Sequence, residues 1–257
     1  MDYEKIKLEI TDGYAVLYLN NPPVNALGQK VLKDIQKALE EIEKNPDIRA
    51  VVISGEGSKV FCAGADITEF ADRSKGILPE VEGSAVFRQI ELFPKPVIAA
   101  LNGSSYGGGT ELAISCHLRI LAAEASMALT EVKLGIIPGW GGTQRLPRLI
   151  GKTKALEVML TGEPIPAEEA LKYGLVNKVV PKDQVLTEAR ALAAKLAKGA
   201  PIAMREILRA VTLGLDTTIE EGLKIEKEGS KIVFSSEDAA EGRTAFFEKR
   251  PPNFKGR

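Results

Sequence analysis

Short apolar runs separated by helical patterns fill the first 180 residues of the chain. Alternating apolar and polar positions over residues 6–10 and 14–19, on either side of a Thr-Asp-Gly turn, predict a β-hairpin. Apolar runs predict further strands at residues 50–54, 97–101, 118–122 and 176–180. The run at 97–101 is nearly continuous, as expected for a strand buried on both faces.

Apolar positions three and four residues apart predict helices between these strands. Asn25 is expected to cap a helix over residues 27–42, which an Asn-Pro pair ends. Shorter helices are predicted at residues 86–92, 143–149, 153–160 and 166–172. Arg145 and Arg148 are expected to be exposed. Strands and helices in this order predict an α/β core.

The pattern changes beyond Pro181, where helical patterns follow one another without strands. Helices are predicted at residues 184–198, 201–213, 218–234 and 236–249. Thr218 and Ser236 are expected to cap the last two. An apolar helical tail that adds no strands must pack on its own core or on another subunit.

Composition argues against several classes of function. The 257 residues carry a net charge of −1, so nothing selects for nucleic acid or an anionic membrane. No apolar run is long enough to span a membrane, the N-terminus is not signal-like, and two cysteines need no oxidising compartment. A cytoplasmic location is therefore expected. The single histidine, His117, argues against a histidine-rich metal site and favours carboxylates as proton carriers.

The stretch over residues 95–151 holds the candidate chemistry. Gly107, Gly108 and Gly109 follow its first strand and precede a helix for which Thr110 is the expected N-cap. Consecutive glycines let a ligand approach the backbone closely, and they leave N–H groups unpaired at a helix N-terminus. This arrangement favours a site for a negatively charged oxygen over a simple tight turn.

Two glutamates stand beside glycine-rich segments. Glu111 follows the first glycine cluster, and Glu131 lies in an apolar stretch shortly before a second cluster at residues 139–142. Environments that push two carboxylate pKa values apart let one group accept and the other donate a proton near neutral pH. The pair is therefore a candidate acid–base couple, although Glu131 alone is more typical of a solvated charge.

Two loops are candidates for the neighbourhood of such a site. Residues 61–66 are mostly small and follow a strand, which again permits a ligand to touch the backbone, although these residues taken alone are more typical of a close turn. Residues 72–83 have little periodicity and are the best candidate for a mobile loop beside a site.

A serine hydrolase is an alternative that the motifs raise. Gly103-Ser-Ser-Tyr-Gly107 matches G-x-S-x-G between a strand and a helix, which is the context of a nucleophile elbow. The only histidine, His117, would lie at the far end of that helix, remote from Ser105. Ser105 is therefore expected to be a small residue in a close turn.

Taken together, these motifs resemble the enoyl-CoA hydratase (crotonase) family. The resemblance rests on FCAGAD from Phe61, KPVIAALNG from Lys95, GGGTEL from Gly107 and GIIPGWGGTQRL from Gly135, and it extends over essentially the whole chain. It implies a crotonase-like spiral of ββα units with an acyl-CoA site over residues 1–190. A helical trimerisation region over residues 191–257 is implied as well, with assembly into a trimer or a dimer of trimers.

The resemblance also implies roles for individual residues and no metal or redox cofactor. It places an oxyanion hole on the backbone N–H groups of Ala65 and Gly108, assigns Glu111 to water activation, and assigns Glu131 to proton delivery. Gly139 would help to hold the water. The remaining implied contacts to an acyl-CoA thioester are Ala63, Asp66, Ile67 and Thr68, with Phe246 and Lys249 closing the nucleotide end of a site, often in a neighbouring subunit.

Both glutamates are present, which favours an enoyl-CoA hydratase of the kind used in fatty-acid β-oxidation. Such an enzyme adds water reversibly to trans-2-enoyl-CoA and forms 3-hydroxyacyl-CoA. An isomerase or another acyl-CoA lyase of the same fold needs fewer acid–base groups and stays open as an alternative. A non-catalytic acyl-CoA-binding or RNA-binding protein is disfavoured by the two carboxylates and by the charge of −1.

Overall fold

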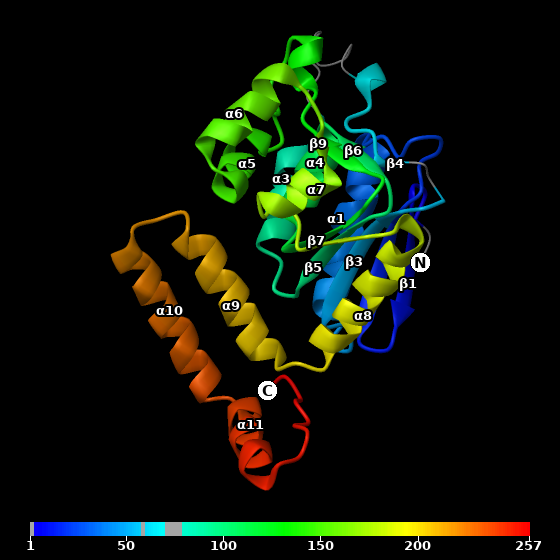
Figure 1. Cartoon of the computed structure of the whole chain (residues 1–257). Helices are drawn as coiled ribbons and strands as arrows, with labels where there is room; N and C mark the ends of the chain where they lie inside the picture. The colour runs from blue at the N-terminus through cyan, green and yellow to red at the C-terminus, as the bar shows by residue number, and fades with distance from the viewer. Residues whose placement is uncertain (1–2, 58–59, 70–78) are drawn as a thin grey trace.

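Two β-sheets surrounded by helices form the body of the chain (Figure 1). The computed structural model describes residues 3–57, 60–69 and 79–257. The larger sheet has the order β1-β2-β3-β5-β7-β10, with β1 (Ile6–Thr11), β2 (Tyr14–Leu19), β3 (Ala50–Gly55), β5 (Val97–Leu101), β7 (Leu118–Ala122) and β10 (Lys178–Val180). Strands β1 and β2 form the predicted hairpin, and from β2 to β10 the neighbouring strands are parallel.

The smaller sheet is built from short strands that follow the carboxyl ends of the larger one. Its order is β4-β6-β8-β9, with β4 (Val60–Cys62), β6 (Ser104–Tyr106), β8 (Ser126–Ala128) and β9 (Ile165–Pro166). The pairs β3–β4, β5–β6 and β7–β8 each place one strand in each sheet, so the same unit recurs along the chain. This arrangement confirms the predicted spiral of ββα units. Strands of two or three residues are too short to leave a periodic signal, and the sequence predicted none of them.

Helices cover the sheets and separate their strands. The α-helices of the core are α1 (Gln29–Lys44), α3 (Gly83–Glu91), α4 (Gly108–Ser115), α5 (Gly142–Ile150), α6 (Lys152–Thr161) and α7 (Ala167–Lys172). The described residues also form short 3-10 helices at η1 (Ile67–Glu69), η2 (Glu131–Leu134) and η3 (Lys182–Gln184). The buried side of α1 carries Val31, Ile35 and Ile42 at the predicted helical spacing.

Two predicted helix caps are wrong. Gly28, not Asn25, is the N-cap of α1, because Asn25 adopts a left-handed φ of +55° and its side-chain amide donates to the carbonyl of Phe61. Gly107 is the N-cap of α4, and Thr110 lies inside the helix, where its hydroxyl pairs with that of Ser105. Both polar side chains connect neighbouring loops or strands instead of capping a helix.

The C-terminal region is helical, as predicted, and beyond residue 200 it extends away from the sheets. It contains α8 (Val185–Ala197), α9 (Pro201–Gly214), α10 (Ile219–Phe234) and α11 (Glu237–Glu248). Helix α8 packs on β3 and β5, and the proposed boundary at residue 190 falls inside it, whereas α9 and α10 lie against each other (Figure 1). The side chains of Thr218 and Ser236 accept from the N–H groups of Glu221 and Ala239, so both predicted caps are confirmed.

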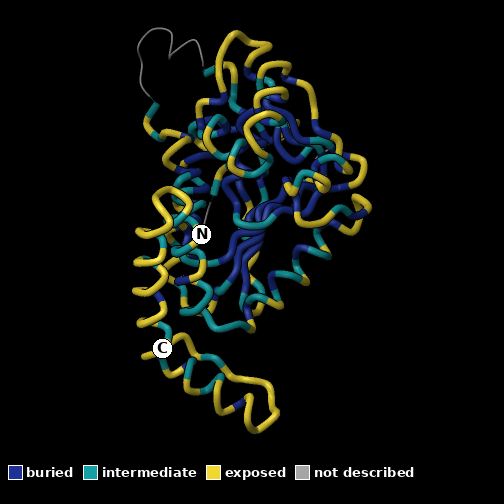
Figure 2. The backbone as a smooth tube through the Cα atoms, turned by 60° about the vertical axis from the view of Figure 1, so that its left-hand side comes forward, coloured by how far each residue is buried: buried dark blue, intermediate teal, exposed yellow. Residues whose placement is uncertain are grey.

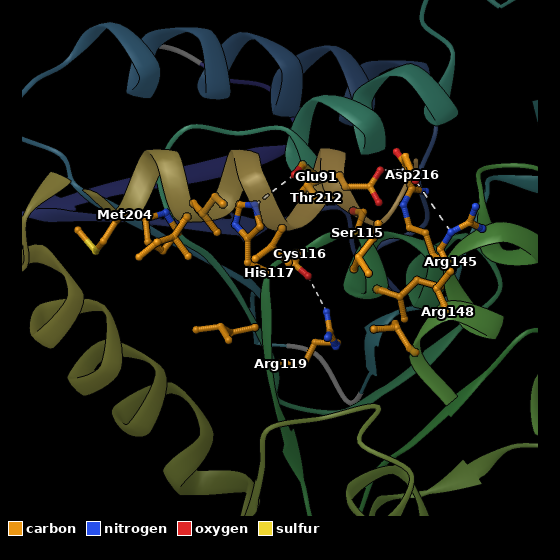
Figure 3. Close-up of a pocket in the computed structure, with 18 of the residues that line it drawn as sticks. Glu91, Ser115, Cys116, His117, Arg119, Arg145, Arg148, Met204, Thr212 and Asp216 are labelled. Atoms are coloured by element: carbon orange, nitrogen blue, oxygen red, sulfur yellow. Dashed lines mark hydrogen bonds and ion pairs between the residues drawn. The ribbon is translucent and has the colours of Figure 1, made fainter. Parts of the chain in front are cut away.

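Figure 2 shows that burial is concentrated in the sheets, while α10 and α11 are mostly exposed. A cavity of about 510 Å³ lies between α9 and the core, and Figure 3 shows polar residues gathered at one end of it. No helix in the described part of the chain combines the length and the apolar character needed to cross a bilayer.

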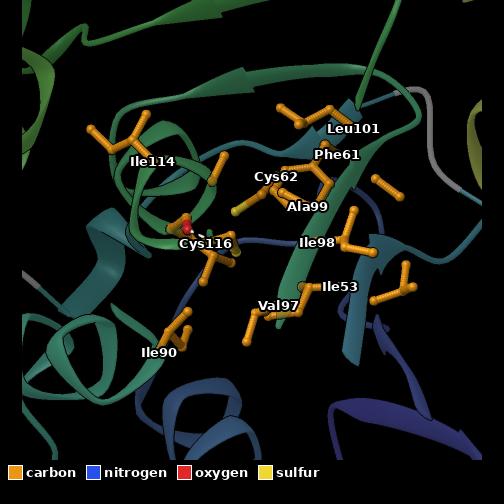
Figure 4. Packing of buried hydrophobic residues seen from close by; sticks show 14 of the residues in the cluster. Ile53, Phe61, Cys62, Ile90, Val97, Ile98, Ala99, Leu101, Ile114 and Cys116 are labelled. Atoms are coloured by element: carbon orange, nitrogen blue, oxygen red, sulfur yellow. Dashed lines mark hydrogen bonds between the residues drawn. The ribbon is translucent and has the colours of Figure 1, made fainter. Parts of the chain in front are cut away.

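The hydrophobic core lies between the larger sheet and the helices that cover it. Ile53, Ile98 and Phe61 are fully buried and belong to one cluster that spans both sheets (Figure 4). Full burial of a side chain of this size contributes about 1.5–3 kcal/mol relative to exposure. The cluster continues through Leu101 and Ile114, so it also supports the segment from β5 to α4.

Gly109 packs very closely against the backbone of Cys62. A Cβ added to Gly109 in the first turn of α4 would lie 2.4 Å from the carbonyl oxygen of Cys62. Gly109→Ala is therefore expected to lower the free energy of unfolding by about 1–3 kcal/mol, because backbone must move. Urea unfolding measures this loss. Gly214→Ala is the control, since its Cβ would meet nothing closer than 3.6 Å; equal midpoints for the two variants would contradict the contact.

Candidate active site

The first turn of α4 is held against two other segments by glycine backbone. Gly107 has a φ of +48° and a ψ of −125°, a conformation that a residue with a side chain rarely adopts. Its N–H donates to the carbonyl of Ala128 at 2.9 Å, which ties the turn to the end of β8. Gly109 lies against Cys62 at the end of β4. The predicted role of the glycine cluster, close backbone approach, is thus realised between segments of the chain itself.

Ala65 and Gly108, whose backbone N–H groups are the proposed oxyanion donors, lie beside each other at this turn. The N–H of Leu27 donates to the carbonyl of Gly64, and that of Asp66 donates to the carbonyl of Leu27. Since N–H directions alternate along extended backbone, the N–H of Ala65 points to the other side, toward α4. A Cβ placed on Gly108 would lie 3.2 Å from the nitrogen of Ala65. The two groups named as an oxyanion hole are therefore adjacent.

Glu111 is buried one turn into α4, and its carboxylate is held by a neighbouring loop. The backbone N–H groups of Trp140 and Gly142 both donate to its Oε1 at 2.8 Å. Burial raises the pKa of Glu111 to about 7, and the nearby charge of Glu131 adds to the rise, while these two donors oppose it. A carboxyl group with this pKa can exchange a proton at neutral pH.

Glu131 is buried at the start of η2, in a different environment. Within the described part of the chain neither of its carboxylate oxygens has a hydrogen-bond partner. Its Oε1 faces Gly107, where an added Cβ would lie only 3.2 Å away. Burial raises the pKa of Glu131, and only the residue's own backbone N–H counteracts this rise. The expectation that Glu131 is a solvated charge is therefore wrong.

A small cavity of about 90 Å³ brings these groups together. It is lined by Ala65, Gly108, Glu111, Glu131, Ile136, Ile137, Gly139 and Trp140. The structure thus places both predicted glutamates, both predicted N–H donors and Gly139 around one space. It places Gly139 at the wall of the cavity, while its neighbours Trp140 and Gly142 hold Glu111.

Trp140, Ile136 and Ile137 form the apolar wall of the cavity. Trp140 packs edge-on against Phe87, with ring centroids 5.5 Å apart, and its ring occupies the space where side chains on Gly83 and Gly108 would stand. The glycine pattern around Trp140 was visible in the sequence, but it did not reveal which distant glycines the ring covers. Ile136 and Ile137 gave no signal apart from their place beside that cluster.

The other predicted contact residues are distributed unevenly around the site. Ala63, Asp66, Ile67 and Thr68 flank Ala65, and the carboxylate of Asp66 accepts from the N–H and hydroxyl of Thr68. Phe246 is 80% exposed at the end of α11, and Lys249 follows it. Figure 1 shows α11 at the opposite end of the molecule from α5, so one chain does not bring these two residues to the cavity.

The structure argues against the serine hydrolase. Ser105 is fully buried and its hydroxyl pairs with Thr110 at 2.8 Å. His117 is engaged elsewhere: its Nδ1 accepts from the N–H of Val97, and its Nε2 lies 3.2 Å from the carbonyl oxygen of Glu91. Of the loop predicted at residues 72–83, residues 72–78 lie outside the described part of the chain.

Arg145 departs from the sequence prediction, because its side chain is only 11% exposed. Its Nη1 donates to the carbonyl of Trp140, and its Nη2 donates to Glu91. Arg148, one turn later, is 52% exposed, as predicted. The buried position of Arg145 follows from the turn at Gly141, which folds the loop back over the guanidinium group.

The raised pKa of Glu111 predicts a pH-dependent cost to stability. The folded chain retains this proton up to about pH 7, whereas the unfolded chain releases it near 4.5, so the unfolding free energy falls as pH rises between these values. Glu111→Gln removes the cost, and we expect it to stabilise the chain at pH 8 by about 1–3 kcal/mol, but not at pH 4.5. Urea unfolding of the parent and of Glu111→Gln at both pH values tests this. The same difference in unfolding free energy between the two proteins at pH 4.5 and pH 8 would contradict the prediction.

Comparison with known proteins identifies the family of this chain. A family model described as enoyl-CoA hydratase/isomerase matches residues 9–257. The crotonyl-CoA hydratase of Syntrophomonas wolfei is 42% identical over 257 residues and 99% of both chains, and the short-chain-enoyl-CoA hydratase of Clostridium acetobutylicum is 42% identical over 97% of both. A crystal structure of enoyl-CoA hydratase from Bacillus anthracis has a TM-score of 0.93 and 40% identity, covering 99% of this chain and 100% of that one. The chain therefore belongs to the enoyl-CoA hydratase/isomerase family, as its motifs indicate.

Proposed function

We propose that this chain is an enoyl-CoA hydratase in which Glu111 and Glu131 carry the proton transfers. It adds water reversibly to a trans-2-enoyl-CoA and forms a 3-hydroxyacyl-CoA. The observation that carries the proposal is that two buried glutamates line one small cavity together with Ala65 and Gly108, which lie beside each other. Relatives with hydratase names at 42% identity over nearly the full chain support the same reaction.

The oxyanion hole supplies the electrostatic part of catalysis. As water adds to the β-carbon of the enoyl thioester, negative charge collects on the thioester oxygen. Two backbone N–H groups at Ala65 and Gly108 would stabilise this enolate-like transition state more than the ground state. Loss of one such donor costs about 10²–10³ in rate in other enzymes. Because these donors are backbone groups, they are fixed by the fold before the substrate arrives.

The two carboxylates differ in their hydrogen bonds. Two neighbouring N–H groups donate to Glu111 and support its charged form, whereas no neighbouring residue in the described structure donates to Glu131. These donors suit Glu111 to act as the base of hydration, with Glu131 as the acid. In hydration, Glu111 takes a proton from the attacking water, whose oxygen bonds to the β-carbon, and Glu131 gives its proton to the α-carbon. Dehydration reverses both transfers.

A short acyl chain suits the cavity. Its volume is about 90 Å³, and Trp140, Ile136 and Ile137 form its apolar wall. The names of two relatives, crotonyl-CoA hydratase and short-chain-enoyl-CoA hydratase, support the same choice. The proposed steps need no metal or redox cofactor, because the chain itself supplies both proton carriers and both oxyanion donors.

The coenzyme A arm is proposed to run along Ala63 and residues 66–68, where η1 begins beside Ala65. Phe246 and Lys249 are proposed to contact the nucleotide end in a neighbouring subunit. Support for assembly comes from the tail, where large apolar side chains stay uncovered in the single chain: Ile207, Val211, Leu215, Leu223, Phe234 and Phe246. A homotrimer or a dimer of trimers would cover them.

The prediction is that the chain removes the ultraviolet absorbance of crotonyl-CoA rapidly and that both Glu111→Gln and Glu131→Gln reduce kcat by about 10²–10⁴. Glu157→Gln, a change at an exposed glutamate, is the matched control and should retain full activity. A folded parent that leaves crotonyl-CoA and longer enoyl-CoAs unchanged would contradict the proposal.

The same variants separate hydration from double-bond isomerisation. A shift of the double bond requires only one carboxylate to move a proton, so it could survive Glu111→Gln. A parent that isomerises 3-enoyl-CoA but does not hydrate 2-enoyl-CoA would transfer the assignment to the isomerase alternative.

A further inference from the structure

Arg145 lies directly behind the loop that holds Glu111, and most of its side chain is covered. Its Nη1 donates to the carbonyl oxygen of Trp140 at 2.9 Å, and its side chain is only 11% exposed. Gly141 makes this contact possible, because a Cβ at that position would lie 2.1 Å from Nη1. Gly141 also has a φ of +109°, a conformation that favours glycine. The guanidinium group therefore fills the space beneath the turn.

Trp140 is held from both ends of its backbone. Its N–H donates to Oε1 of Glu111 at 2.8 Å, while its carbonyl accepts from Arg145. The next donor to Glu111, the N–H of Gly142, lies on the other side of the same turn. The Trp140 carbonyl belongs to the peptide that lies between the two peptides carrying these N–H groups. A tilt of this central peptide would therefore misdirect both N–H groups, and the hydrogen bond from Arg145 resists the tilt.

Arg145 is itself oriented by an acidic partner. Its Nη2 donates to Oε2 of Glu91 at 2.9 Å, and Arg88 donates to the same oxygen at 2.7 Å. Burial alone would raise the pKa of Glu91, but the hydrogen bonds from Arg145 and Arg88 outweigh this and lower it. Glu91 therefore stays ionised and keeps the guanidinium group in place. Figure 3 shows Glu91, Arg145 and Arg148 at one end of the larger cavity.

We propose that Arg145, oriented by Glu91, is a positioning residue that keeps the Trp140 and Gly142 N–H groups aimed at Glu111. The inference rests on the proposed hydratase function. Because both donors bind Oε1, the other oxygen of Glu111 stays available to the attacking water. The positive charge of Arg145 also lies close enough to favour the charged form of Glu111, alongside the opposing influence of Glu131.

The test compares Arg145→Gln, Arg145→Lys and Glu91→Gln with the parent and with a matched control. Arg145→Gln removes the positive charge and the planar guanidinium group that donates from two nitrogens. Arg145→Lys keeps the charge, but a single ammonium group cannot reproduce the planar fork that bridges two acceptors. Arg148→Gln is the control, because Arg148 is on the same helix, is 52% exposed and does not contact the Trp140 carbonyl.

The expected result is a fall in kcat of up to about 10²-fold for Arg145→Gln on crotonyl-CoA, with KM nearly unchanged. The acidic limb of the kcat/KM profile should move to higher pH, because the anion of Glu111 loses support. Compared with Arg145→Gln, Arg145→Lys should bring the acidic limb closer to its position in the parent but should recover less of the parent's kcat. The kcat of Glu91→Gln should lie between the values for the parent and for Arg145→Gln. Arg148→Gln should match the parent. A folded Arg145→Gln protein with the parent's kcat and acidic limb would overturn the proposal.

A second readout does not depend on turnover. NMR titration of ¹³C-labelled glutamate side chains, assigned to Glu111 by the Glu111→Gln spectrum, should show a higher pKa for Glu111 in Arg145→Gln and in Glu91→Gln. An unchanged Glu111 titration in Glu91→Gln would overturn the proposal even if Arg145→Gln failed to fold. An inactive parent with a shifted titration would instead contradict the hydratase function while supporting the role of Arg145.

Discussion

The site depends on how closely the start of α4 approaches the neighbouring segments of the chain. Only glycine, which has no Cβ, permits these short distances. Gly109 meets the carbonyl of Cys62, Gly107 meets the carboxylate of Glu131, and Gly108 meets both the Ala65 amide and the ring of Trp140. One helical turn thus touches the end of β4, the start of η2 and the Trp140 loop. A side chain at any of these positions would separate the segments that must converge.

This convergence sets the electrostatics. The packing that brings the segments together also excludes water, so both glutamates lose solvation and both pKa values rise. The two differ in hydrogen bonding: two neighbouring N–H groups donate to Glu111, whereas no neighbouring residue in the described structure donates to Glu131. We propose that this difference in backbone contacts gives Glu111 the role of base and Glu131 the role of acid. The cost is a site that opposes folding at neutral pH, which the apolar core must offset.

Much of this organisation could be predicted from the sequence, and the rest could not for physical reasons. The strands of the larger sheet and the helices of the tail are long enough to show periodicity, whereas β4, β6 and β8 are too short. The pairing of Glu111 with Glu131 was suggested by glycine-rich surroundings and by the lack of a second histidine. The burial of Arg145, the coverage of Gly83 and Gly108 by Trp140, and the true partners of Asn25 and Thr110 depend on contacts between distant segments. The sequence next to a charged or capping residue does not show such contacts.

The division of labour between the two glutamates is the central claim, and α-proton exchange tests it most directly. Butyryl-CoA in ²H₂O has an α-proton but no double bond to hydrate, so its exchange needs only the oxyanion hole and a base at the α-carbon. We expect the parent and Glu111→Gln to exchange this proton at similar rates and Glu131→Gln to lose the exchange, as followed by NMR. Exchange that depends on Glu111 and survives Glu131→Gln would contradict the account.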